Sequence, residues 1–89
     1  MPERYIQNKE IIQSKIDDEV VMLDVESGFY FGLNSVGSVI WGHLADWISI
    51  DELTQRLMTQ FDIDQETCRT DTETFLEQLL EKKIIRKEA

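Results

Sequence analysis

Two residues in the sequence have side chains that could take part in covalent catalysis. His43 is the only histidine and Cys68 is the only cysteine. A cysteine beside a histidine can act as an activated nucleophile, so a small cysteine hydrolase is one interpretation. However, His43 falls near the apolar face of a predicted helix, and Cys68 falls at the start of a later apolar stripe. A packed histidine and a buried thiol are common in such patterns, which favours structural roles for both.

Motifs for other catalytic or cofactor chemistry are missing from the sequence. One cysteine and one histidine fall short of the roughly four ligands that a structural zinc site needs. The chain has no G-x-S-x-G elbow, no phosphate-binding loop and no dinucleotide-type glycine pattern. Acidic pairs such as Asp17-Asp18 and Asp62/Asp64 are typical of turns and helix caps. We therefore expect no catalytic residues, no metal and no cofactor.

The chain is strongly acidic, with nine basic residues, eighteen acidic residues and a net charge of −9. Such a charge repels the phosphate backbone of nucleic acids and favours the approach of a cationic partner. Acidic side chains also dominate the exposed face of the last predicted helix: Asp64, Glu66, Asp71, Glu73, Glu77 and Glu81. The pattern argues against a nucleic-acid partner. An acidic surface that serves solubility alone is the competing interpretation.

The length of 89 residues corresponds to one domain over residues 1–89, with an expected ordered core over about residues 8–85. No run approaches the ~20 apolar residues that span a bilayer, and the first residues lack the apolar run of a secretory signal. A lone cysteine cannot form an internal disulfide, which is typical of a reducing compartment. We expect a cytoplasmic protein with no membrane contact.

The first third of the chain has the alternating pattern of β-strands. Strands are expected over Glu10 to Ile16, Glu19 to Val25 and Phe29 to Leu33. Asp17-Asp18 and Glu26-Ser27-Gly28 are the expected turns, and turns this short imply an antiparallel meander. Alternation assigns shared faces to two sets of side chains: Val21, Leu23 and Val25, and Phe29, Phe31 and Leu33.

The period then changes to that of helices. Asn34 or Ser35 can cap the first helix, Ser49 and Glu52 form a capping box for the second, and Asp64 can cap the third. The expected apolar faces are Val36, Ile40, Leu44 and Trp47; then Ile50, Leu53, Leu57 and Phe61; then Thr72, Phe75, Leu76, Leu79, Leu80 and Lys83. We expect Arg86 to Ala89 to fray. A three-stranded antiparallel sheet followed by three helices predicts an α+β domain of the winged helix-turn-helix type.

The third predicted strand, Phe29-Tyr30-Phe31-Gly32-Leu33, carries three aromatic residues in a row. At a sheet edge, its free main-chain groups could pair with an incoming strand. Gly32 would let another backbone approach closely. The competing interpretation is that the aromatic rings are core residues, although alternation directs Tyr30 away from the other two. The strand is a candidate peptide-binding edge.

The segment Leu23 to Trp41, LDVESGFYFGLNSVGSVIW, resembles the central signature of PqqD-like proteins. Its YFGLN-x-VG-x-x-IW form is especially similar to the stand-alone version found in split lasso-peptide pathways. Asp51-Glu52-Leu53 and residues 71–79 continue the pattern, so the resemblance covers roughly residues 10–85. Two segments depart from it. Asp46 is not followed by the usual glycine, and Lys83-Ile84-Ile85 stands where Gly-Leu-Leu is common.

The resemblance implies a non-catalytic recognition element for ribosomally synthesised, post-translationally modified peptides (RiPPs). Such an adaptor binds the leader segment of a precursor peptide by strand addition. In lasso pathways it works with a separate leader-cleaving cysteine protease and an ATP-dependent cyclase. The matching strand residues are Phe29, Tyr30, Phe31, Gly32 and Leu33. On the third helix, Thr72, Phe75, Leu76 and Leu79 fall nearest the implied groove, with Asp71 and Gln78 at its rim.

Two other functions remain open on the sequence. One is a PqqD-like peptide chaperone for a radical enzyme in the biosynthesis of a cofactor or another RiPP. The other is a winged-helix DNA-binding regulator, which the acidic last helix disfavours.

Overall fold

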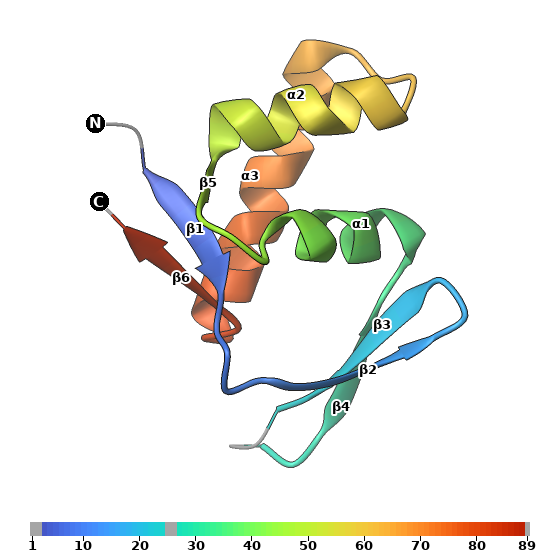
Figure 1. Cartoon of the computed structure of the whole chain (residues 1–89), viewed down its shortest axis with the longest axis vertical. Helices are drawn as coiled ribbons and strands as arrows, with labels where there is room; N and C mark the ends of the chain where they lie inside the picture. Colours follow the sequence, from blue (N-terminus) through green and yellow to red (C-terminus); the bar gives the residue numbers. More distant parts are fainter. Residues whose placement is uncertain (1–2, 25–26, 89) are drawn as a thin grey trace.

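Two small antiparallel sheets and three helices make up the fold (Figure 1). The structure, a computed structural model, describes residues 3–24 and 27–88. The elements in chain order are β1 (Arg4–Gln7), β2 (Ile12–Ile16), β3 (Glu19–Leu23), β4 (Tyr30–Leu33), α1 (Ser35–His43), β5 (Ile48–Ser49), α2 (Ile50–Gln60), α3 (Gln65–Glu81) and β6 (Ile85–Glu88). The predicted α+β class is confirmed. None of the described helices is long and apolar enough to cross a membrane.

The predicted meander is the sheet β2-β3-β4. Asp17 has a φ of 56° in the first turn, a conformation that aspartate tolerates better than most residues. Gly28 has a φ of 76°, and it lies with Phe29 opposite Asp24 in the second turn. The Gly28 N–H donates to the Asp24 carbonyl, and the Asp24 N–H donates to the Phe29 carbonyl, as in a glycine β-bulge. Val25 and Glu26, which were predicted in this strand and turn, lie outside the described residues.

A second sheet, β5-β1-β6, was not predicted. It pairs the two ends of the chain, with Arg4 opposite Glu88 and Gln7 opposite Ile85. The expectation that the chain frays from Arg86 is wrong up to Glu88, because these residues pair with β1 and Ile85 is only 3% exposed. Ala89 lies outside the described residues. Regular secondary structure is therefore present on both sides of residues 8–85.

All three helices begin at the predicted caps. The side chains of Asn34, Ser49 and Asp64 accept hydrogen bonds from the main-chain N–H groups of Gly37, Glu52 and Thr67. The reciprocal half of the capping box is replaced by an ion pair, since the Glu52 carboxylate accepts from Arg56 at 2.9 Å. The first helix is shorter than expected. It ends at His43, so Trp47 lies beyond it, just before β5.

The end of α3 has a strained residue. Ile84 donates to the Leu79 carbonyl and Lys83 to the Leu80 carbonyl, which together form a Schellman motif. Lys83 therefore occupies the left-handed position that glycine normally takes, with a φ of 60°. For a residue with a side chain this conformation costs about 1–2 kcal/mol.

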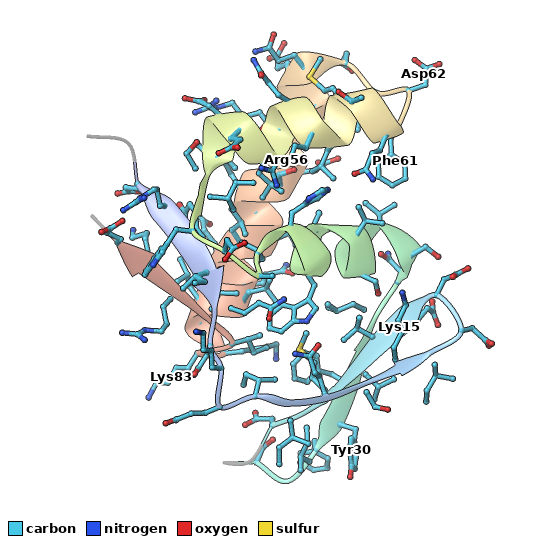
Figure 2. The ribbon with its side chains drawn as sticks, viewed as in Figure 1. Lys15, Tyr30, Arg56, Phe61, Asp62 and Lys83 are labelled. Carbon is cyan, nitrogen blue, oxygen red and sulfur yellow. The ribbon has the colours of Figure 1, made fainter. Side chains whose placement is uncertain are left out.

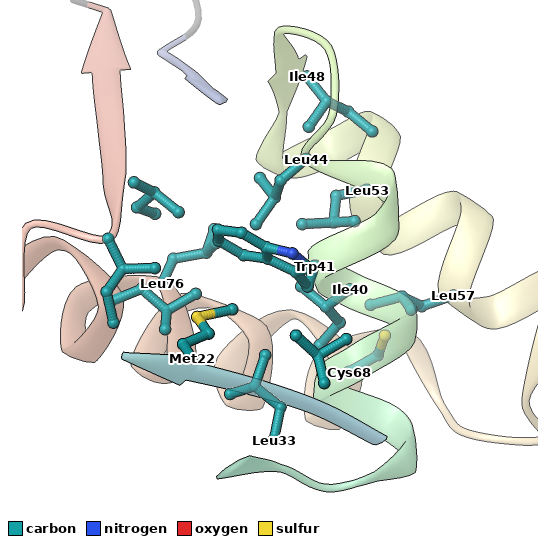
Figure 3. Packing of buried hydrophobic residues seen from close by; sticks show 14 residues of the cluster. Met22, Leu33, Ile40, Trp41, Leu44, Ile48, Leu53, Leu57, Cys68 and Leu76 are labelled. Carbon is teal, nitrogen blue, oxygen red and sulfur yellow. The ribbon is translucent and has the colours of Figure 1, made fainter. Parts of the chain in front are cut away.

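The core lies between the helices and the inner face of the meander (Figure 3). Trp41 of α1 is 2% exposed and packs in one cluster with Met22, Leu33 and Leu76. Its indole N–H donates to the Gln13 side chain at 2.6 Å, and its carbonyl accepts from the Gln7 side chain at 2.7 Å. These two bonds connect α1 to strands of both sheets. On β3 the buried residues are Val20 and Met22, so the face with Val21 and Leu23 is the outer one.

We predict opposite effects of alanine at two glycines whose missing side chains face open space. No atom lies within 4 Å of a Cβ built at Gly28 or at Gly42. Gly28→Ala should lower the free energy of unfolding by about 1 kcal/mol, because only Gly28 has a positive φ. Gly42→Ala, within α1, should raise it by about 0.5–1 kcal/mol. Urea denaturation measures both values, and a change of the same sign in both variants would contradict the geometry.

We also predict a pH effect at the α3 cap. The Thr67 main-chain N–H holds the pKa of Asp64 below its ordinary value of 3.8. The stabilisation is present above the unfolded pKa and is lost as pH falls through the folded pKa. Asn still caps but does not titrate. The urea midpoint should therefore fall less for Asp64→Asn than for the original chain between about pH 5 and about pH 2. Equal falls would contradict the prediction, because the hydrogen bond from the Thr67 N–H to the side chain at position 64 would then not depend on charge.

Candidate peptide-binding edge and groove

The outer edge of β4 has main-chain groups that the sheet leaves unpaired. Among the described residues, β4 pairs with β3 alone, and it is the last strand of its sheet. In an antiparallel ladder, every second residue points its N–H and C=O toward the neighbouring strand. The hydrogen bond from the Asp24 N–H to the Phe29 carbonyl shows which residues of β4 these are. Counting in steps of two from Phe29, the N–H and C=O groups of Phe31 and Leu33 point toward β3. The N–H and C=O groups of Tyr30 and Gly32 therefore point outward along the free edge.

The end of β4 is attached firmly to the start of α1. Asn34 is the one residue between them, and its side-chain oxygen accepts from the Gly37 N–H at 2.8 Å. The Ser38 hydroxyl accepts from the Val20 N–H at 2.9 Å and donates to the Leu33 carbonyl at 3.2 Å. This hydroxyl connects α1 to the last pair of the β3–β4 ladder. The edge strand and the helix consequently have a fixed relative orientation.

A groove lies beside this edge. It encloses about 700 Å³ between β4, the first turns of α1, the α2–α3 connection and α3. Its lining residues are Gly32, Leu33, Asn34, Val36, Gly37, Ile40, Leu57, Phe61, Asp62, Ile63, Cys68, Asp71, Thr72, Phe75 and Gln78. A Cβ at Gly37 would come within 3.3 Å of the Phe75 ring, so this glycine lets α1 approach α3 closely. We call this feature the β4–α3 groove.

Six of the predicted site residues line the groove: Gly32, Leu33, Asp71, Thr72, Phe75 and Gln78. Leu76 and Leu79 do not, contrary to expectation. They are 1% and 2% exposed, because they lie on the side of α3 that belongs to the hydrophobic core.

The three aromatic residues of the strand lie apart from the groove lining. Phe29 precedes β4 and is 75% exposed, so the competing interpretation that its ring is a core residue is wrong. Tyr30 is 70% exposed and points away from the body of the molecule (Figure 2). Phe31 is half-buried opposite Met22, with the Lys82 ammonium 5.6 Å from its ring centroid. The edge strand therefore offers a ligand the main chain of Tyr30. Of the residues of β4, only Gly32 and Leu33 line the groove.

Several groove residues were not predicted as site residues. They come from the cap and first turns of α1, from α2, from the α2–α3 connection and from the start of α3: Asn34, Val36, Gly37, Ile40, Leu57, Phe61, Asp62, Ile63 and Cys68. A signal was present in the sequence, since Phe61 and Ile63 are apolar residues in a short polar connection. Val36 stays 46% exposed although it belongs to the apolar face of α1. Apolar residues left partly exposed around one groove indicate a surface that a ligand can cover.

The charge of the groove is negative. Its charged lining residues are Asp62 and Asp71, and both are acidic. The nearest basic residue on α3 is occupied, because the Arg69 guanidinium pairs with Asp51 and with Glu73 at 3.0 Å. The bond to Asp51 raises the pKa of Arg69 above its ordinary value. The groove therefore favours a ligand with an extended backbone, apolar side chains and positive charge.

His43 and Cys68 have separate partners. His43 Nε2 lies 2.9 Å from the Gln60 side-chain oxygen at the surface. The Cys68 thiol is buried and donates to the Thr54 carbonyl at 3.9 Å. Each group has a local structural contact, in agreement with the structural roles favoured above. In residues 3–24 and 27–88, no three His, Cys, Asp or Glu side chains are grouped so that they could hold a metal ion.

Two solved structures have this fold, and one protein-family model matches the sequence. The TbiB1 chain, solved in complex with the TbiA(beta) leader peptide, is 32% identical with a TM-score of 0.81, and the match covers 91% of this chain and 94% of TbiB1. Lasso peptide synthetase B1, solved with its leader peptide, has the same fold, with 24% identity, a TM-score of 0.79 and coverage of 92% and 96%. No curated protein sequence matches. The family model for coenzyme PQQ synthesis protein D (PqqD) matches residues 19–85. The chain therefore belongs to the PqqD family.

Proposed function

We propose that this protein binds the leader segment of a ribosomally synthesised precursor peptide as an added strand on β4. The observation that carries the proposal is the outward-facing main chain of Tyr30 and Gly32 directly beside the β4–α3 groove. Main-chain bonds to the edge would supply affinity with little demand on sequence, and the apolar groove would select the leader's side chains. Basic side chains of the leader would meet Asp62 and Asp71.

The absence of a side chain at Gly32 supports the same function. Gly32 has no positive φ, and the nearest atom to a Cβ there would be the Val20 carbonyl oxygen at 4.0 Å. The chain's own fold therefore tolerates a larger residue at this position. A β-strand normally gains from a side chain that packs, so glycine fits a strand that another backbone must approach closely.

A lasso-peptide pathway is the setting that the comparisons favour over cofactor biosynthesis. TbiB1 is 32% identical over nearly the whole chain and was solved with a leader peptide, and lasso peptide synthetase B1, also solved with a leader peptide, has the same fold. PqqD-like leader-binding proteins are non-catalytic, and we assign this chain the same role in the cytoplasm. It would present the leader to a separate leader-cleaving cysteine protease and an ATP-dependent cyclase.

An adaptor needs a surface for those enzymes besides the groove. The outer face of the β2-β3-β4 sheet offers one, because three of its side chains are largely exposed. Ile12, Ile16 and Tyr30 are 57%, 59% and 70% exposed. These side chains are not in the groove, so the leader and an enzyme could bind at the same time.

The direct test is titration of a fluorescein-labelled leader, taken from the precursor gene beside this one, with anisotropy as the readout. We expect saturable binding with a Kd of about 0.01–1 μM, since ordering the leader offsets part of the interaction free energy. Absence of saturable binding to every leader encoded beside the gene would refute the proposal.

Charge reversal at the groove tests the site. Asp71→Lys changes an exposed residue of the lining, and for a leader with basic residues we expect Kd to rise about 5- to 20-fold. Glu77→Lys is the matched control, because it makes the same charge change on the exposed surface of α3 outside the groove lining. We expect less than about a twofold effect there. Equal effects of the two substitutions would indicate that net charge, and not the groove, determines binding.

A further inference from the structure

Unpaired basic side chains surround a second hollow, which the leader groove does not use. The hollow encloses about 670 Å³ on the terminal sheet, and three of its lining residues are Lys9, Lys83 and Arg86. Its apolar lining includes Trp47 and Leu80. We call it the basic hollow. It lies far from the groove, since Lys83 and Asp62 are at opposite corners of the molecule in the view of Figure 2.

Most of the six other basic residues differ from those of the basic hollow, although in the described residues Lys15 has no carboxylate partner and Lys82 lies over the Phe31 ring. Four of these groups have a carboxylate partner: Arg4 with Glu88, Arg56 with Glu52, Arg69 with Asp51 and Glu73, and Lys87 with Glu3. Within the described part of the chain, Lys9, Lys83 and Arg86 pair with no carboxylate. Glu10 is the one acidic residue among the lining residues. In a chain of net charge −9, these three residues form a local excess of positive charge.

The backbone at Lys83 is a second, independent observation. Its φ of 60° is the left-handed conformation for which glycine is suited, and the Schellman bonds of α3 hold it there. The chain thus has a lysine where the backbone conformation favours glycine, and that residue lines the basic hollow. Strained residues of this kind are frequent at binding sites.

We propose that the basic hollow docks a short acidic segment of a partner protein. Carboxylates of the segment would pair with Lys83, Arg86 and Lys9, and an apolar side chain between them would pack against Trp47 and Leu80. Trp47 is 39% exposed, with the Arg4 guanidinium 5.8 Å from its ring centroid, so the rest of its exposed surface is available for such contact.

The apolar lining and the net charge favour a short peptide segment over a long polyanion. A nucleic acid or an anionic membrane would extend beyond the three basic groups and meet the acidic remainder of the surface. A short segment senses mainly the local charges, because the Debye length is about 8 Å at physiological ionic strength.

The test uses a fluorescein-labelled, N-acetylated 12-residue peptide that alternates Glu or Asp with Leu. We expect saturable anisotropy with a Kd in the range of about 10–500 μM at low salt, weaker as salt rises. In ¹⁵N-labelled protein, the shifted resonances should include the Trp47 indole and the amides of Lys83 and Arg86.

Substitutions separate docking from folding and from net charge. Lys83→Glu should raise Kd at least about fivefold, whereas Lys15→Glu, the same charge change on β2, should change it less than about twofold. Lys83→Gly should raise the urea midpoint by relieving the backbone and still weaken the peptide. The affinity for the leader should be unchanged in all three variants. A failure of the acidic peptide to bind therefore leaves the leader proposal intact.

Three results would overturn the proposal. The first is no saturable binding of the acidic peptide, and the second is an equal loss in Lys15→Glu. The third is tighter binding of a 12-base-pair DNA duplex or of anionic phospholipid vesicles than of the peptide. That result would assign the surface to phosphate groups.

Discussion

The geometry of the candidate site depends on the one-residue connection between β4 and α1. Asn34 both ends the edge strand and caps the helix, and the Ser38 hydroxyl joins α1 to the last β3–β4 pair. The strand edge therefore cannot rotate independently of the helix. Because Gly37 lets Phe75 approach, the same connection also sets the distance from the edge to α3. A short local segment thus determines where the unpaired main chain lies relative to the groove.

Local sequence patterns were sufficient for most of the fold. The meander, the three helices and their caps at Asn34, Ser49 and Asp64 follow from signals within a few residues. The terminal sheet did not, because Arg4 pairs with Glu88 across nearly the whole chain and each strand has four residues. A local sequence pattern contains no information about a partner strand that lies so far away along the chain.

The groove was predictable only in part for a related reason. The apolar stripe of α3 is broad, and periodicity cannot tell which of its residues other elements will cover. The core covers Leu76 and Leu79, while Thr72 and Phe75 line the groove. The contributions of α1 and of the α2–α3 connection depend on tertiary packing. The charge distribution has the same origin, since folding brings Lys9 beside the basic residues that follow α3.

The central claim is that the Tyr30 and Gly32 main chain is unpaired in the free protein and bonds to the leader. Amide hydrogen exchange of the ¹⁵N-labelled protein, with and without saturating leader, tests it residue by residue. We predict that the Tyr30 and Gly32 amides exchange quickly in the free protein and slow at least about tenfold in the complex. The Phe31 amide, which faces β3, should be protected in both states. Unchanged exchange at Tyr30 and Gly32 in a fully bound sample would contradict the account.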